Sequence, residues 1–220
     1  MEWMDGARRR GGLIWVGAGV LFQLAWLLMR EEPPGPITVA LCLLVVALAV
    51  VTIVAQQSLL AVIAAWILAV ALGLDLMAAM ADRFGLFGPP GSAGVSWGSW
   101  EHFVAYTGEL LGPVLAPLSP VAALLATLVE AVLSVLLVSG WQRRWAGKLT
   151  AGLLTIYLVA MAFTVGLDEV ARYGMPLLIG GALLISAVPA RRPRRKPGAA
   201  RDSANGSAWR ANTAARTVRR

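Results

Sequence analysis

An almost uninterrupted apolar run over residues 37–80 constrains this chain more than any other feature of its sequence. At about 1.5 Å per residue, one helix of that length would be roughly twice as long as the ~30 Å apolar core of a bilayer is thick. The run must therefore fold back on itself, and the triplet QQS at 56–58 is the only polar cluster near its middle. We predict two membrane-spanning helices, over residues 37–55 and 59–81.

The remaining sequence has the same character. The 220 residues are 58% hydrophobic and 14% charged, which leaves too little polar surface for a soluble domain of this length. Each further apolar stretch is long enough, or nearly long enough, to cross a bilayer. We therefore expect an all-α integral membrane protein with six transmembrane helices, over residues 13–29, 37–55, 59–81, 120–140, 146–167 and, for the shortest, 173–188.

The distribution of basic residues predicts how these helices are oriented. With six spans and a cytoplasmic N-terminus, all but three of the 19 basic residues fall on the cytoplasmic side, as the positive-inside rule expects. The three exceptions are Arg30, Arg83 and Arg172, which we place on the outer side. The pattern predicts a multi-pass protein of a bacterial plasma membrane with its N- and C-termini in the cytoplasm.

The formal net charge of +7 comes from a basic tail over residues 190–220, which holds ten Lys or Arg residues and one Asp. The tail is rich in Pro, Gly and Ala and has almost no clustered apolar residues, so we expect it to be disordered. Two roles stay open for it: it can lean on the anionic headgroups of membrane lipids, or it can bind a cytoplasmic partner. The charge therefore gives no reason to expect nucleic acid as a partner.

The counts of cysteine and histidine exclude several redox and metal centres. Cys42 is the only cysteine, so the chain cannot form an internal disulfide, a CxxC pair or a cysteine-ligated cluster. His102 is the only histidine, which excludes a bis-histidine haem and a multi-histidine metal site built from this chain alone. We expect no metal site and no cofactor in the chain itself.

Two acidic residues lie inside predicted spans, where a charge costs about 2.5–3.5 kcal/mol. Glu130 is near the middle of its span and shares a helix face with Thr127 and Ser134, so this face should point into the bundle. We expect a hydrogen bond from Glu130 to Thr127 or Tyr157. Glu130 is then either a protonated structural residue, which glutamine would replace without loss of folding, or a proton relay or ligand-binding group. Asp75 lies on a stripe of mostly small residues and is either functional or close enough to the outer end to reach the headgroups.

A Gly- and Pro-rich stretch, GPPGSAGVSWGSW over residues 88–100, leads into the segment that holds His102. Trp100, Phe103 and Tyr106 recur at steps of three, which predicts a short interfacial helix with His102 beside its aromatic face. Three roles stay open for His102: a structural residue at the interface, a group that donates a hydrogen bond or a proton to a quinone, and a metal ligand. The candidate functional residues are therefore Glu130, His102, Asp75, Tyr157, Tyr106 and Trp100.

Residues 82–107, DRFGLFGPPGSAGVSWGSWEHFVAYT, and the later LATLVEAVLSVLLVSG resemble the DoxX family of bacterial membrane proteins. The resemblance covers residues 59–189 and is to an actinobacterial branch of the family. Glu130 matches an acidic residue that is typical of the family's second helix. The division of the chain that this implies is a two-helix N-terminal transmembrane hairpin at 1–57, a DoxX-like four-helix bundle at 58–189 with an outer loop at 82–119, and the tail at 190–220.

The resemblance implies a role in a membrane redox complex. Relatives include the membrane subunit of a thiosulfate:quinone oxidoreductase and a mycobacterial membrane component that gathers a superoxide dismutase and a thiosulfate sulfurtransferase. This chain would be a non-catalytic or quinone-facing subunit in sulfur or oxidative-stress metabolism, with membrane lipids, redox-enzyme subunits and a second copy of itself as candidate partners. Two other classes stay open: a small-solute or proton-coupled transporter that uses Glu130, and a purely structural membrane scaffold.

Overall fold

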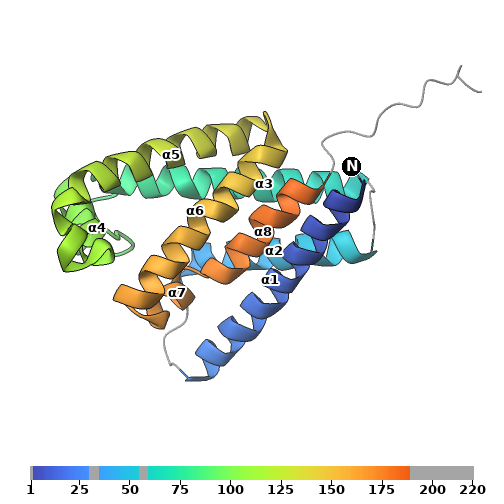
Figure 1. The fold of residues 1–220 in the computed structure, drawn as a ribbon, viewed down its shortest axis with the longest axis horizontal. Coiled ribbons are helices and arrows are strands. Elements are labelled where there is room, and N and C mark those ends of the chain that lie inside the picture. The colour runs from blue at the N-terminus through green and yellow to red at the C-terminus, as the bar shows by residue number, and fades with distance from the viewer. Residues whose placement is uncertain (1, 30–34, 55–58, 189–220) are drawn as a thin grey trace, which may run out of the picture. The chain divides into compact units, whose positions relative to one another are not determined.

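Every regular element among the described residues is a helix, and no strand occurs there. The computed structural model describes residues 2–29, 35–54 and 59–188, so the turns predicted near 30–34 and 56–58 and the basic tail lie outside the described residues. The expectation of an all-α protein is confirmed for this part of the chain. Figure 1 shows the helices α1 (Glu2–Met29), α2 (Pro36–Val54), α3 (Leu59–Arg83), α4 (Trp100–Leu115), α5 (Ser119–Ser139), α6 (Arg143–Thr164), α7 (Leu167–Arg172) and α8 (Met175–Ala187), with a 3-10 turn over Ala116–Leu118.

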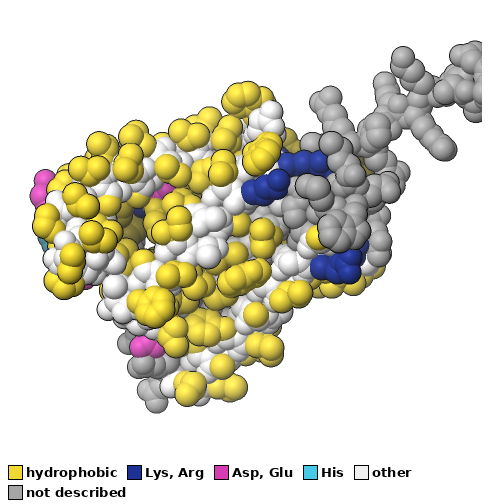
Figure 2. Space-filling model, in the orientation of Figure 1, with side chains coloured by type: hydrophobic (Ala, Val, Ile, Leu, Met, Phe, Trp, Pro, Cys, Tyr) yellow, Lys and Arg dark blue, Asp and Glu magenta, His cyan; other side chains and the backbone are white. Residues whose placement is uncertain are grey.

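Five helical stretches are long and apolar enough to cross a membrane, namely Arg9–Met29, Pro36–Val54, Leu59–Arg83, Trp100–Ser139 and Arg143–Thr164. Large apolar side chains such as Leu28, Val135 and Phe163 are exposed along them, which suits contact with lipid. Figure 2 shows hydrophobic side chains covering the helices on the visible face, with Lys and Arg gathered toward one end. The chain is therefore a multi-pass helical membrane protein.

The sixth predicted span corresponds to α8, a shorter apolar helix of 13 residues. At about 1.5 Å per residue it is roughly 20 Å long, shorter than a ~30 Å apolar core, so it is not among the five long apolar stretches. The bundle encloses it instead: α1, α2, α3 and α6 pack around it, and all of its residues except Leu183 are buried. Helix α8 thus faces protein, and not lipid, on nearly every side.

The close approach of α1 and α8 depends on glycines in both helices. A Cβ atom on Gly19 would lie 2.8 Å from the backbone nitrogen of Leu177, and one on Gly180 would lie 2.8 Å from that of Val16. Such contacts leave no room for a side chain, as is typical of membrane helices that pack through small residues. The first helix and the last described helix are therefore direct neighbours within a compact unit, Met1–Ala190.

Two polar contacts fix the other end of α1. Gln23 Nε2 donates a hydrogen bond to the Ala171 carbonyl (2.9 Å), and Trp26 Nε1 donates one to Asp168 Oδ1 (3.1 Å). Both bonds join the first span to α7, the short helix that directly precedes α8. Helix α2 packs mainly on α3 and α8. Whether residues 1–57 form a separable hairpin stays a prediction.

The Gly- and Pro-rich stretch connects α3 to α4, and a helix follows it as expected. Helix α4 begins after Ser99, whose side chain accepts the His102 backbone N–H, and it bends at Gly112, just before Pro113. Gly98 has φ +67°, and a Cβ atom there would lie 2.5 Å from the nitrogen of Pro90, so only glycine fits this turn. Helix α4 packs against α5. The connection itself is held at the C-terminal end of α3, where the Ser96 backbone N–H donates a hydrogen bond to Asp82.

Candidate functional site

Glu130 of α5 lies inside the bundle with 1% of its surface exposed. The Tyr157 hydroxyl of α6 donates a hydrogen bond to Glu130 Oε1, which is one of the two bonds expected from the sequence. Glu130 Oε2 lies 2.6 Å from Arg83 Nη2, at the end of α3. Thr127 and Ser134 are buried on the same face of α5, so the inward orientation of this face is confirmed.

Arg83 is a partner that reading the sequence did not reveal. The charge pattern places it on the outer side of the membrane, and the structure shows that its side chain is buried. Its Nη1 donates a hydrogen bond to Thr127 Oγ1 (2.9 Å), and its guanidinium carbon lies 3.8 Å from the centre of the Phe103 ring. The sequence feature that could have identified Arg83 is Glu130 itself, because a charged residue inside a membrane usually pairs with another. Arg83 is a candidate partner because it ends α3, the helix that packs on α5.

The ion pair with Arg83 offsets the free-energy cost of burying the Glu130 carboxylate. Arginine stays protonated in proteins and offers only hydrogen-bond donors, so the carboxyl oxygen that faces it acts as an acceptor. The Arg83 charge compensates the Glu130 charge, and the Tyr157 hydroxyl satisfies the other oxygen. The contacts therefore favour a buried ion pair over a protonated structural glutamate. Asp75 is half-buried in α3 and lies within electrostatic range of Glu130, but it takes no part in the contacts of Arg83.

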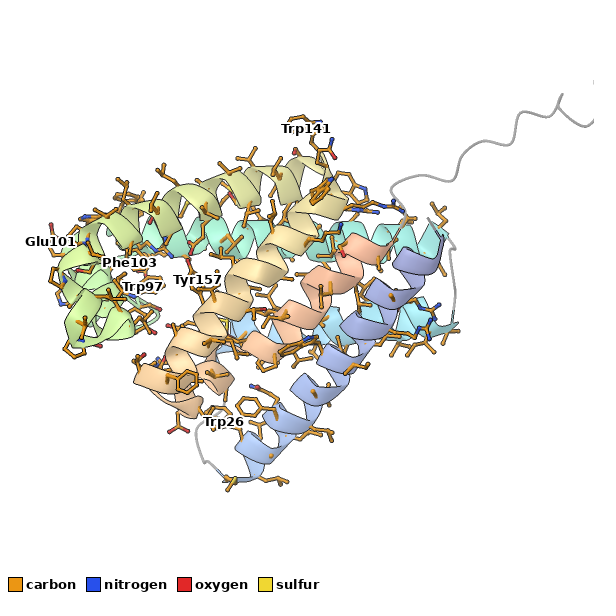
Figure 3. The ribbon with its side chains drawn as sticks, in the orientation of Figure 1. Trp26, Trp97, Glu101, Phe103, Trp141 and Tyr157 are labelled. Atoms are coloured by element: carbon orange, nitrogen blue, oxygen red, sulfur yellow. The ribbon has the colours of Figure 1, made fainter. Side chains whose placement is uncertain are left out.

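Asp82, the neighbour of Arg83, holds the connection between α3 and α4. Its Oδ2 accepts hydrogen bonds from the backbone N–H groups of Ser96 (2.9 Å) and Trp97 (3.0 Å). The Trp97 ring lies 5.2 Å from the Arg83 guanidinium carbon and makes an edge contact with the Phe103 ring. Figure 3 shows Trp97 and Phe103 near Tyr157 in this view. The last two residues of α3 thus fix both the backbone and the ring of Trp97.

A pocket of about 340 Å³ opens beside Trp97, and we call it the loop pocket. It brings together His102 and Tyr106, two of the residues singled out from the sequence. Trp100 lies elsewhere, stacked on Phe84 at a ring separation of 5.9 Å. The connection, α4, α7 and the residue after α7 form the walls, whose aromatic and charged members include Trp97, His102, Tyr106, Glu169, Arg172 and Tyr173.

Hydrogen-bond donors are available at this pocket. The Tyr106 hydroxyl is buried and has no hydrogen-bond partner among the residues that the structure describes. The Nδ1 atom of His102 lies 3.1 Å from Ser99 Oγ, which leaves Nε2 for another group. Tyr173 also lines the pocket, and a tyrosine hydroxyl can donate a hydrogen bond. The loop pocket thus combines aromatic ring faces with side chains that can donate hydrogen bonds to a ligand carbonyl.

Metal binding finds no support in the described ranges. They contain no group of three or more His, Cys, Asp or Glu side chains that could hold a metal ion. Cys42 is half-buried in α2, and a Cβ atom on Gly174 would lie 2.8 Å from its sulfur. The thiol therefore packs against the turn before α8 as a small apolar side chain does.

The fold and the site define a multi-pass helical membrane protein in which a buried Arg–Glu ion pair adjoins an aromatic pocket with free donors. Comparisons with protein-family models, with curated proteins and with solved structures found no match for this chain. Family and activity are therefore inferred from the residues themselves.

Proposed function

We propose that this chain is a DoxX-like membrane subunit of a redox complex, non-catalytic on its own, and that its loop pocket binds the head group of a membrane quinone. The loop pocket carries this proposal. It places the Trp97 ring beside a Tyr106 hydroxyl that has no partner among the described residues and beside Nε2 of His102. These groups come from one connection and one helix, next to helices with exposed apolar surfaces.

The chemistry of a quinone head group fits this arrangement. The head group is a flat ring with two carbonyl oxygens, so it needs an aromatic face and hydrogen-bond donors. Tyr106 and His102 supply donors, and Trp97 supplies a ring. The volume of about 340 Å³ lies at the lower end of the roughly 300–1,000 Å³ that small-molecule sites occupy. Exposed apolar residues at the end of α4 and in the 3-10 turn that follows it, Val114 and Leu118 among them, offer a surface for an isoprenoid tail.

The transporter alternative receives less support from the contacts. It requires Glu130 to bind and release a proton or a solute, yet both of its carboxyl oxygens already face Tyr157 and Arg83. A purely structural scaffold would explain the ion pair but gives no use for donors left open in the loop pocket. The quinone-facing subunit accounts for both features.

The resemblance of residues 59–189 to the DoxX family supports the assignment to redox metabolism. The finer architecture belongs to the same proposal: a two-helix hairpin, a four-helix bundle, cytoplasmic termini and redox-enzyme subunits as partners. A reporter that is active only outside the membrane should be active within residues 88–98 and silent at Arg220. Activity of the Arg220 fusion would contradict the proposed orientation.

Quinone binding tests the function directly. The full chain in mild detergent is titrated with a short-chain naphthoquinone, and saturable quenching of tryptophan fluorescence reports binding. Tyr106→Phe removes one donor and should weaken binding about two- to tenfold, because a single hydrogen bond contributes about 0.5–1.5 kcal/mol. His102→Ala should have an effect of similar size.

Trp100→Phe is the matched control, because Trp100 is an aromatic residue of α4 outside the loop pocket. It should leave the dissociation constant unchanged. Absence of saturable binding, or equal binding by the parent, Tyr106→Phe and His102→Ala, would reject the proposed site. Extraction of the purified protein should also release a quinone of the host membrane.

A further inference from the structure

The wall of the loop pocket is connected to the interior of the bundle by a short chain of contacts. Trp97 lines the pocket, and its ring centre lies 6.3 Å from that of Tyr106. On its other side the Trp97 ring lies 5.2 Å from the guanidinium carbon of Arg83. The pocket and the ion pair therefore share one side chain.

Arg83 in turn is held by residues of α5. Glu130 pairs with Nη2, and Thr127 accepts a hydrogen bond from Nη1, so two separate nitrogens of the rigid guanidinium are fixed. Phe103 covers the guanidinium at 3.8 Å, and Trp97 makes an edge contact with Phe103. Because a guanidinium that contacts two rings favours particular orientations of both, the position of Arg83 influences where the Trp97 ring lies.

We infer that Arg83 is the positioning residue of the loop pocket: held by Glu130 and Thr127, it sets the Trp97 wall and couples ligand binding there to the ion pair inside the bundle. Its effect on a bound quinone rests on the proposed function, whereas its effect on Trp97 does not. Coupling of this kind is reciprocal, so a ligand against Trp97 also stabilises the arrangement of Arg83.

The test reads Trp97 without any ligand. The full chain is labelled with 5-fluorotryptophan, and the Trp97 resonance is assigned by its loss in Trp97→Phe. Thr127→Val is the decisive variant: it removes the hydroxyl that accepts the Arg83 hydrogen bond and keeps the shape of the side chain, so it acts on Arg83 from α5. Arg83→Lys is the second variant, because it keeps the charge and loses the planar group that contacts the rings. Both should shift or broaden the Trp97 resonance.

Ser134→Ala is the matched control, since Ser134 is buried on the same face of α5 and its hydroxyl donates to the Ala131 carbonyl of its own helix. It should leave the Trp97 resonance unchanged. Titration with the short-chain naphthoquinone should then show binding about five- to tenfold weaker in Arg83→Lys and unchanged in Ser134→Ala.

An unmoved Trp97 resonance in folded Thr127→Val and Arg83→Lys proteins would overturn the inference. If Arg83→Lys does not fold, Thr127→Val decides alone, because the ion pair remains in that variant. A shifted Trp97 resonance in a protein that binds no naphthoquinone, parent included, would uphold the positioning role and reject the proposed quinone site. The two proposals can therefore fail separately.

Discussion

Helix α8 and the connection between α3 and α4 are both shorter than a typical membrane span, yet they are held in place by opposite means. Helix α8 is enclosed by apolar neighbours, and its contact with α1 depends on the absence of side chains at Gly19 and Gly180. The connection is held by charged groups: Asp82 binds its backbone, and Arg83 faces its Trp97 ring. In a membrane, where apolar surface gains little by burial against protein, close packing and polar contacts are the two available ways to fix such segments.

The largest expected effect concerns the charged side of this comparison. Glu130→Gln keeps the shape of the side chain but leaves the buried Arg83 without its counter-charge. Loss of one partner of a buried ion pair costs about 3–5 kcal/mol, so we expect a large drop in the unfolding free energy measured by denaturation in mixed micelles. The ion pair therefore reverses the expectation, drawn from the sequence, that glutamine would be tolerated for folding.

A double variant sharpens that prediction. Arg83→Met combined with Glu130→Gln removes both charges, so its loss of stability should be smaller than the sum of the two single losses. Additive losses would show that the two side chains do not depend on each other.

The apolar side of the comparison is tested at Gly19. Gly19→Ala places a Cβ atom 2.8 Å from the backbone of Leu177 and should cost about 1–3 kcal/mol through overpacking. Gly17→Ala is the control on the same helix, because a Cβ atom there meets nothing within 4 Å. Thermal unfolding in detergent should separate the two variants, and equal melting temperatures would contradict the close α1–α8 contact.

The last expected effect is confined to one segment, so it is the smallest for the molecule as a whole. Asp82→Ala leaves the N–H groups of Ser96 and Trp97 without their acceptor, at a cost of about 1–3 kcal/mol that falls on the connection alone. Hydrogen exchange should accelerate at residues 95–98 and stay slow in α8. Glu101→Ala, which removes an exposed carboxylate from the first turn of α4, should change neither. Faster exchange in α8 of the Asp82 variant would show that the two segments are not held independently.

Hydropathy predicted most of the fold. Long apolar stretches mark membrane spans because the bilayer accepts little else, so five of the predicted spans overlap the five long apolar stretches. The fourth stretch, Trp100–Ser139, also includes α4, whereas the predicted span over 120–140 matches α5 alone. The burial of α8 escaped prediction for a physical reason. A helix that faces lipid and one that faces protein are equally apolar in sequence. What distinguishes α8 is that its glycines pack against the backbone of a neighbouring helix, which the structure shows and the sequence does not.

The candidate site was predicted in part. The spacing of Thr127, Glu130 and Ser134 identified the inward face of α5, and Tyr157 was found as a partner of Glu130. Arg83 was missed because an arginine at the end of a span usually extends to the headgroups. The loop pocket could not be predicted either, because its shape depends on an irregular connection whose path is set by the Asp82 hydrogen bonds and the turn at Gly98.

The contact between α1 and α8 also has a consequence for biosynthesis. Gln23 and its acceptor Ala171 are 148 positions apart, so α1 enters the bilayer well before the ribosome has made the helix that covers it. During that interval the amide of Gln23 and the backbone at Gly19 face lipid or another helix that has already been inserted. A nascent chain arrested before residue 167 should therefore be the species that depends most on the insertase, and the speed of translation between α1 and α7 would set how long it persists.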